Sequence, residues 1–152
     1  MNIIPLGERM EFIEELAALH HSEWGHLNPS LTLEKRIGKL ASLAGGRSIP
    51  SIFIATSGNE LIGSAALVLE DMQSRPDLSP WLAAVYVKEK YRSQGVASAL
   101  VAKCEYEAKR SKVDTLYLYT EFASKLYERL GWRSLEPCMY RDVSVNIMYK
   151  EI

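Results

Sequence analysis

The stretch RSQGVASAL (residues 92–100) follows an apolar run, WLAAVYV (81–87), across the basic turn KEKY (88–91). A run without polar positions is typical of a central strand that is covered on both faces. After the turn, small residues open a helix, and the first backbone N–H groups of a helix have no partner within it. An anion can approach such groups closely where the side chains are small. The stretch therefore predicts a strand, a turn and an anion-binding helix start.

The apolar pattern on either side predicts a single α/β (α+β) domain over residues 1–152, long enough to bury a full core. Before the run, the segments with strand or helix character are a strand at 2–6, helices at 8–19 and 28–44, and strands at 52–56 and 61–69. After the turn come a helix from residue 95, a strand at 115–120, a helix at 123–130, and strands at 132–135 and 143–149. The predicted order is β-α-α-β-β-β-α-β-α-β-β.

Local signals place the ends of these elements. Helical periodicity breaks at HHSEWGHLNPS (20–30), which predicts a loop, and Asn28 with Pro29 predicts the start of the second helix. SGNE (57–60) has the length of a hairpin loop, so it predicts a turn between the strands at 52–56 and 61–69. Gly131 is placed to end the helix at 123–130. EPCMYRD (136–142) is expected to separate the last two strands.

Composition excludes a strong global attraction to other polymers. The chain is 47% hydrophobic and 24% charged with a formal net charge of -1, so nothing draws it as a whole to nucleic acid or to an anionic membrane. No apolar run approaches the roughly 20 residues of a membrane span, and the first residues lack the pattern of a signal peptide. We therefore expect a cytoplasmic protein without nucleic-acid or membrane partners.

The metal-binding residue types are scattered. Cys104 and Cys138 lack the spacing of metal ligands, and the sequence shows no secretory signal, so we expect buried free thiols rather than a disulfide. His20, His21 and His26 are irregularly spaced and have no acidic or cysteine partner, so no metal cofactor is expected.

Two motifs carry a resemblance to a known family. The spacing Arg-x-x-Gly-x-Ala in RSQGVA (92–97) resembles the acetyl-CoA-binding motif of the GNAT superfamily of N-acetyltransferases, written Gln/Arg-x-x-Gly-x-Gly/Ala. The sequence KLYERLGW (125–132) resembles the Tyr-x-x-x-Gly-aromatic element that follows later in that family. The predicted element order also resembles the GNAT order over nearly the whole chain. The resemblance implies a mixed sheet of six to seven strands, helices on both faces, and a splayed central strand pair.

The resemblance implies that acetyl-CoA is the cosubstrate. Its pantetheine arm would lie between the strands at 81–87 and 115–120, bonded to backbone groups as an added strand would be. Its pyrophosphate would lie on the backbone N–H groups of the helix start, near the positive charge of Arg92. Lys88 lies close in sequence, whereas Lys90 is expected to be a solvated charge. The residues so assigned to acetyl-CoA are Val85, Tyr86, Val87, Arg92, Ser93, Gln94, Gly95, Val96, Ala97 and Ser98.

The implied reaction is direct attack of a primary amine on the thioester. A backbone N–H near Val85 would stabilise the developing oxyanion. Tyr127 matches the family's tyrosine that faces the departing sulfur. A phenol of pKa about 10 would protonate a thiolate of pKa about 8.5 uphill by roughly 2 kcal/mol. We therefore expect Tyr127 to stabilise the sulfur by a hydrogen bond at least as much as by proton transfer.

The general base is not assigned by a motif. Many GNAT enzymes have an acid on the central strand, but this strand begins WLAA (81–84). Glu70, Asp71 and Glu121, at strand ends, could each reach the mouth of the cleft, and an ordered water is an equal contender.

The acceptor also stays open. The segment 20–24 and the connection 71–80 are both candidate walls of the acceptor pocket, but a surface loop with an anchoring Trp24 is the simpler interpretation of the first. We expect a small-molecule amine, with a protein N-terminus or lysine as the alternative acceptor. The missing strand carboxylate leaves a non-catalytic acyl-CoA-binding module as a further hypothesis. Homodimers are common in the family, but these residues do not decide the oligomeric state.

Overall fold

The computed structural model describes residues 1–46 and 48–152. Within these residues, seven strands form one sheet in the order β1-β2-β3-β4-β5-β7-β6. The strands are β1 (Asn2–Pro5), β2 (Ser51–Ser57), β3 (Glu60–Val68), β4 (Trp81–Val87), β5 (Thr115–Thr120), β6 (Arg133–Tyr140) and β7 (Val143–Glu151). Neighbouring strands are antiparallel except β4 and β5, which are parallel. The predicted mixed sheet is confirmed, and WLAAVYV is its central strand.

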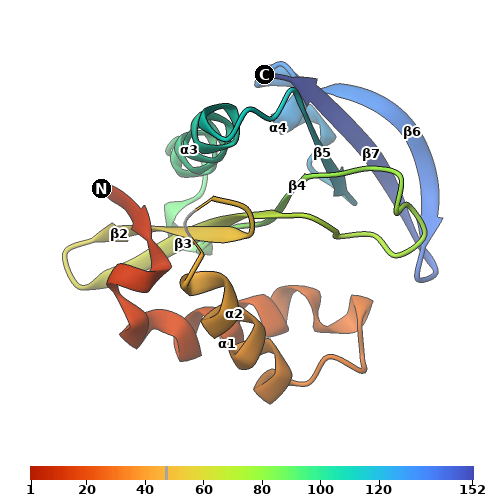
Figure 1. Ribbon diagram of the computed structural model, residues 1–152. Helices are drawn as coiled ribbons and strands as arrows, with labels where there is room; N and C mark the ends of the chain where they lie inside the picture. Colours follow the sequence, from red (N-terminus) through yellow and green to blue (C-terminus); the bar gives the residue numbers. More distant parts are fainter. Residues whose placement is uncertain (47) are drawn as a thin grey trace.

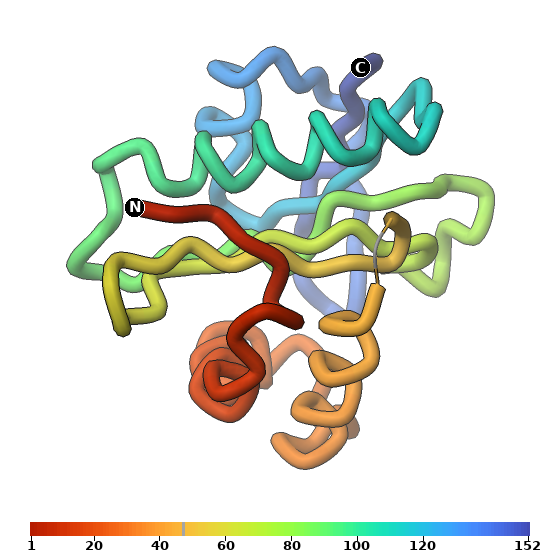
Figure 2. The backbone as a smooth tube through the Cα atoms, turned by 60° about the vertical axis from the view of Figure 1, so that its left-hand side comes forward, coloured from red at the N-terminus to blue at the C-terminus, as the bar shows by residue number. Residues whose placement is uncertain are grey.

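Helices cover both faces of this sheet. They are α1 (Ile13–Trp24), α2 (Leu33–Ala44), α3 (Val96–Arg110) and α4 (Ser124–Arg129). The helices α1 and α2 form a layer below the sheet, whereas α3 crosses above it and α4 lies on the α3 side (Figure 1). The backbone tube, turned by 60°, shows the same three layers (Figure 2). The predicted element order and the placement of helices on both faces are confirmed.

A separate apolar core fills the space on each side of the sheet. On the α3 side, Leu100 and Cys104 pack against Leu82 and Leu118, all of them buried. On the α1–α2 side, the fully buried Leu16 is part of a cluster with Leu40, Ile54 and Leu61. Each fully buried leucine stabilises the fold by about 1.5–3 kcal/mol relative to an exposed one. These two cores hold β4 in the middle of the molecule, in contact with helices on both sides.

The central strand pair is splayed, as the family resemblance implied. In the described part of the chain, β4 and β5 share one register pair, Trp81 with Tyr117, near the start of both strands. The Tyr117 N–H also donates to the Pro80 carbonyl at 3.1 Å. Beyond this point the strands diverge, so the later backbone groups of each strand lie along an open wedge.

The first helical region differs from the prediction. Residues 20–24 continue α1 instead of forming a loop, because no glycine or proline occurs between Gly7 and Gly25. The helix α2 begins at Leu33, and its N-cap is Thr32, whose hydroxyl accepts from the Lys35 N–H at 3.2 Å. The assignment of Asn28 and Pro29 to the start of that helix was therefore wrong.

The last hairpin also differs. Residues 136–140 belong to β6 and not to a connection. Pro137 is tolerated there because β6 is the edge strand of the sheet. The turn consists of Arg141 and Asp142, with φ of 50° and 65°, as a two-residue hairpin turn requires. Cys104 and Cys138 are both free, but only Cys104 is buried, so the expectation of two buried thiols was wrong for Cys138.

Candidate active site

The middle of β4 contains a β-bulge. Ser64 of β3 pairs with Tyr86, whereas Ala66 pairs with Ala83, so Ala84 and Val85 together face the single residue Ala65. Ala84 has a left-handed φ of 52°, which is strained for a residue with a Cβ. The bulge turns the Ala84–Val85 peptide out of the regular ladder. It lies where β4 runs along the wedge that separates it from β5.

The helix α3 begins just beyond the end of β4. Gly95 is its N-cap, with φ of 82°, and no side chain accepts from the free N–H groups of the first turn. A Cβ at Gly95 would meet nothing within 4 Å among the described residues, so the space in front of the helix is open. Residues 92–95 are exposed, and Ser93 also has a left-handed φ, 63°. Together these features form an open set of N–H donors that suits an anion.

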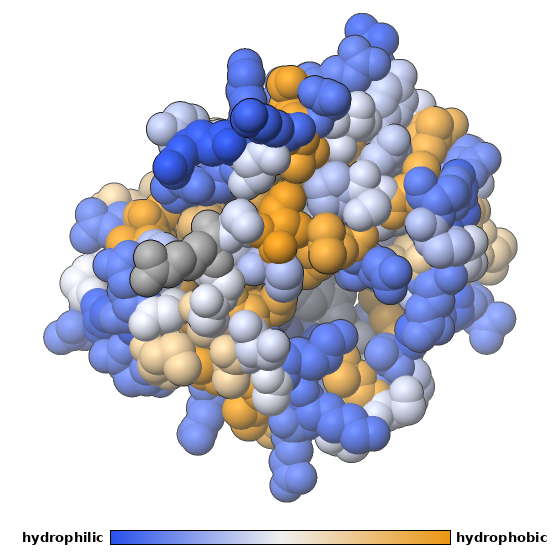
Figure 3. Space-filling model, in the orientation of Figure 1, coloured by the Kyte–Doolittle hydropathy of each residue, from blue (hydrophilic) through white to orange (hydrophobic). Residues whose placement is uncertain are grey.

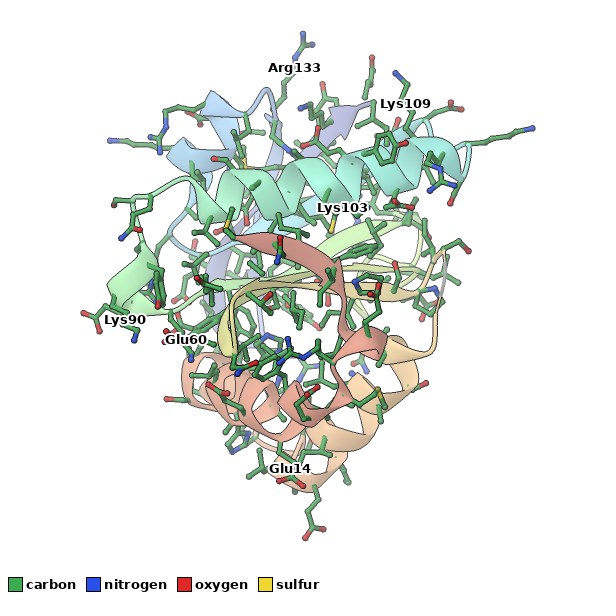
Figure 4. The ribbon with its side chains drawn as sticks, turned by 90° about the vertical axis from the view of Figure 1, so that its left-hand side faces the viewer. Glu14, Glu60, Lys90, Lys103, Lys109 and Arg133 are labelled. Atoms are coloured by element: carbon green, nitrogen blue, oxygen red, sulfur yellow. The ribbon has the colours of Figure 1, made fainter. Side chains whose placement is uncertain are left out.

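The basic residues of the turn differ in their partners. Lys88 Nζ lies 2.7 Å from a carboxylate oxygen of Glu15, and Lys90 Nζ lies 2.7 Å from one of Glu60. Figure 4 shows Lys90 beside Glu60. Arg92 has no carboxylate within ion-pair distance among residues 1–46 and 48–152, and its Nε donates to the Val87 carbonyl at 2.9 Å. Unlike Lys88 and Lys90, Arg92 is therefore available to form an ion pair with an anionic ligand.

Tyr127 lies on α4 with its ring in the α3-side core. Its ring is 6% exposed and packs edge-to-face on Trp132, with 6.1 Å between centroids. Burial raises the pKa of the Tyr127 hydroxyl above its usual value of about 10. The phenol is therefore protonated at neutral pH and can donate a hydrogen bond.

The three carboxylates considered for the base lie in different surroundings. Glu70 is exposed and Glu121 is half-buried. Asp71 is half-buried next to Met72, which is buried in one apolar cluster with Trp81. Burial raises the pKa of Asp71 to about 7, against the opposing charges of Lys39 and Arg141.

An aromatic wall lies near Asp71 on the α1–α2 side of the sheet. The ring centroids of Trp81 and Tyr119 are 6.1 Å apart, and those of Tyr119 and Tyr140 are 5.4 Å apart. Burial and the Asp71 charge raise the pKa of Tyr119, so its ring lies within the field of that carboxylate. The space-filling view, which has the orientation of Figure 1, shows a hollow near the centre of the molecule with apolar side chains along its upper margin (Figure 3).

Two buried polar side chains lie behind the bulge, and the sequence analysis missed their role. Ser64 donates to the Ala84 carbonyl at 2.8 Å, and His20 Nε2 lies 2.8 Å from the same hydroxyl. His20 packs against Trp24 in the last turn of α1, so the expectation of a surface loop was wrong. The spacing of Ile13, Leu16, Ala17, His20 and Trp24 along one helical face was the signal available.

The family model for the acetyltransferase (GNAT) domain matches residues 48–134, which is more than half of the chain. The chain belongs to the GNAT family. The predicted family is thereby confirmed, and the match includes both motifs on which that prediction rested. It takes in the bulge of β4, the start of α3, and Tyr127.

Curated relatives of this GNAT chain include N-alpha-acetyltransferase 30 of Xenopus laevis and of Homo sapiens. Each is 34% identical to it over 84 residues, which is 53% of this chain. The match spans 30% of the frog protein and 23% of the human protein, so the chain corresponds to less than a third of either relative.

Solved structures agree over almost the whole chain. An aminoglycoside 6'-N-acetyltransferase complexed with coenzyme A has a TM-score of 0.80 at 16% identity, over 99% of this chain and 97% of that one. The ribosomal-protein-alanine N-acetyltransferase of Brucella melitensis has a TM-score of 0.78 at 20% identity, over 100% of both chains. At these identities the likeness establishes the GNAT fold.

Two kinds of feature are absent from the described residues. Residues 1–46 and 48–152 contain no group of three His, Cys, Asp or Glu side chains that could hold a metal ion. In the same residues, no helix has the length and apolar character needed to cross a membrane.

Proposed function

We propose that this GNAT protein transfers an acetyl group from acetyl-CoA to a primary amine. The observation that carries the proposal is the uncapped, exposed start of α3 at Gly95, placed at the open end of the β4–β5 wedge. A similar fold was crystallised with coenzyme A in the aminoglycoside 6'-N-acetyltransferase. The same two features, an anion site and an adjoining wedge, suit a molecule with a pyrophosphate and an extended arm.

Each part of acetyl-CoA has a suitable partner in this chain. The pyrophosphate would accept hydrogen bonds from the N–H groups of residues 93–98. Arg92 would supply the positive charge, because Lys88 and Lys90 are already paired with carboxylates. The pantetheine amides would bond to the free backbone edge of β4 at residues 85–87. The acetyl group would then lie beside the bulge.

The chemistry needs a neutral amine, an oxyanion donor and a stabilised leaving group. The amine nitrogen forms a bond to the thioester carbon, and the electron pair of the carbonyl moves to oxygen, where the Val85 N–H can donate. Collapse of this intermediate breaks the C–S bond, and the electron pair leaves on sulfur. The Tyr127 hydroxyl, kept protonated by burial, would donate to that sulfur.

Asp71 is the carboxylate best suited to take the amine proton. A general base works best when its pKa is near the operating pH, and burial places the pKa of Asp71 at about 7. The exposed Glu70 has no comparable environment, and Glu121 follows β5 on the other side of the wedge. The rings of Tyr119 and Tyr140 would also attract an amine that arrives protonated, through cation–π contacts, before Asp71 takes its proton.

The acceptor that we propose is a small-molecule amine, and a protein N-terminus is the second candidate. The carboxylate of Asp71 beside Tyr119 and Tyr140 suits a compact cation. The 34% identity to N-alpha-acetyltransferase 30 over 84 residues favours the second candidate.

A thiol-release assay with acetyl-CoA tests the proposal directly. The amine panel would contain a polyamine, an aminoglycoside, a peptide with a free N-terminus, and a blocked peptide with an internal lysine. Calorimetric titration of CoA runs beside it. Turnover of the small amines supports the proposal, whereas turnover of the free N-terminus alone favours the second candidate. CoA binding without turnover on any amine would instead favour a non-catalytic module, and absence of CoA binding would refute both.

A further inference from the structure

Two hydrogen bonds connect α1 to the bulge of β4 through side chains that are closed to solvent. The Ser64 hydroxyl donates to the Ala84 carbonyl at 2.8 Å, and His20 Nε2 lies 2.8 Å from Ser64 Oγ. A hydroxyl has one proton to donate, and here it goes to Ala84. His20 Nε2 must therefore carry a hydrogen and donate it to Ser64, so the chain runs from His20 through Ser64 to Ala84.

His20 is built into the fold as a neutral ring. It is 2% exposed and packs against Trp24 and Tyr86, with ring centroids 4.9 Å and 6.0 Å away. Burial, and secondarily the charge of Arg36, lowers the pKa of His20 to about 3. The ring is therefore uncharged at physiological pH and donates to Ser64 in a single arrangement.

The pair has the distance of a base and a nucleophile, but it cannot act as one. Ser64 is 0% exposed, so no acyl group can approach its hydroxyl. Its proton is already directed at the Ala84 carbonyl. Any effect of the pair on the reaction must therefore pass through the Ala84 carbonyl, to which Ser64 donates.

Ala84 controls the direction of one N–H group. The Ala84 carbonyl and the Val85 N–H belong to the same planar trans peptide and point in opposite directions. A hydrogen bond that holds the carbonyl on one side therefore holds the N–H on the other. Because Ala84 has a left-handed φ of 52° outside the ladder, the neighbouring strand does not hold this peptide by regular pairing. The bond also polarises the peptide and strengthens its N–H as a donor.

We propose that His20 and Ser64 are positioning residues that orient the Val85 N–H toward the acetyl carbonyl oxygen. This inference rests on the proposed acetyl transfer. Neither residue touches substrate, and both act through the Ala84–Val85 peptide. Their effect belongs to the chemical step and not to the binding of CoA.

The kinetic test uses Ser64→Ala with a matched control. Ser64→Ala is expected to lower kcat by about 10-fold, because a misdirected donor stabilises the oxyanion less, while the CoA dissociation constant changes by less than about 2-fold. Ser51→Ala removes another buried hydroxyl, 2% exposed and without a hydrogen-bond partner among the described residues, and should leave kcat unchanged. His20→Leu should match Ser64→Ala, whereas His20→Gln, which keeps a donor, should recover most of the turnover. The double variant of His20→Leu and Ser64→Ala should be no slower than Ser64→Ala alone.

A second readout does not need activity. The Val85 amide resonance in the CoA complex should move in Ser64→Ala and in His20→Leu, and should stay in place in Ser51→Ala. Unchanged kcat and an unmoved Val85 amide in Ser64→Ala would overturn the inference, and so would equal losses of kcat and CoA affinity. If the wild type binds CoA but acetylates no amine, the proposed function fails. In that case the Val85 amide resonance still tests whether His20 and Ser64 orient the peptide. An unchanged resonance in Ser64→Ala would overturn this orienting role as well.

Discussion

At the residue scale, burial gives two titratable groups pKa values that suit different parts of the proposed reaction. Burial raises the pKa of the Tyr127 hydroxyl, so this residue retains its proton. Burial also raises the pKa of Asp71, but only to about 7, so this residue changes charge near neutral pH. One group therefore suits hydrogen-bond donation to sulfur, and the other suits proton transfer from the amine.

Replacement of Tyr127 by phenylalanine removes the hydroxyl and keeps the ring that packs on Trp132. We expect kcat to fall by about 10-fold or more, because a hydrogen bond to a charged group is worth about 1.5–3 kcal/mol. The dissociation constant of CoA should be unchanged. Tyr106→Phe, at an exposed tyrosine of α3, is the control and should behave as wild type. Equal loss of CoA affinity and kcat would show that Tyr127 acts only in packing.

Replacement of Asp71 by asparagine removes the proposed base. The kcat/KM of the wild type should rise with pH through about 7, as Asp71 loses its proton. Asp71→Asn should lack this rise and should be slower by about 100-fold at pH 8. If Glu70→Gln or Glu121→Gln abolishes the pH dependence instead, the assignment of Asp71 is wrong.

The stability of the same variant provides an independent readout. The folded pKa of Asp71, about 7, lies above the unfolded value of 3.8. Its contribution to stability is therefore fully present below pH 3.8 and is lost as the pH rises through 7. Asp71→Asn should remove this loss, so its melting temperature relative to wild type should increase between pH 5 and about 8. A constant difference over that range would contradict the burial of the Asp71 carboxylate.

At the element scale, the proposed site is the junction of the bulged strand β4, the diverging strand β5 and the uncapped helix α3. Most of this could be predicted from the sequence, because RSQGVA and the apolar run before it are local signals with a known meaning. The bulge could not be predicted, because it is an irregularity in the pairing of β3 with β4, and the sequence of one strand does not show how that strand pairs with another. The sequence analysis left Glu70 and Asp71 open as bases, because both follow the end of β3 and only the packing of the connection leaves Glu70 exposed and Asp71 half-buried. His20 and Ser64 are 44 residues apart and meet only when α1 packs under the sheet.

The start of α3 makes a prediction of its own. Gly95→Val places a side chain in the open space before the helix and strains a left-handed φ of 82°. CoA affinity should fall by at least ~10-fold, which is about 1.4 kcal/mol. Gly58→Val is the matched control, since Gly58 also has a left-handed φ, 58°, and open space around it, but lies in the β2–β3 turn. Calorimetry should show normal CoA affinity for Gly58→Val, and equal losses in the two variants would show that strain alone is responsible.

At the scale of the whole molecule, the proposed function gives the two faces of the sheet different roles, one for the cofactor and one for the acceptor. The α3 side carries the exposed start of α3 and Tyr127, whereas the α1–α2 side carries Asp71, the aromatic wall and His20. The wedge between β4 and β5 connects the two sides at the bulge. The element order and the two motifs predicted helices on both faces and the residues for acetyl-CoA, but not an acceptor side. In the proposed function the acceptor would meet side chains from α1, the 69–80 connection and the last hairpin, where local pattern was least informative.

A crystal structure of the protein with CoA tests the central claim most directly. The account predicts the pyrophosphate on the backbone N–H groups of residues 93–98, with the pantetheine arm between β4 and β5. It also predicts the thiol near the Tyr127 hydroxyl and the Val85 N–H. CoA bound elsewhere, or a pyrophosphate held by side chains away from the start of α3, would contradict it.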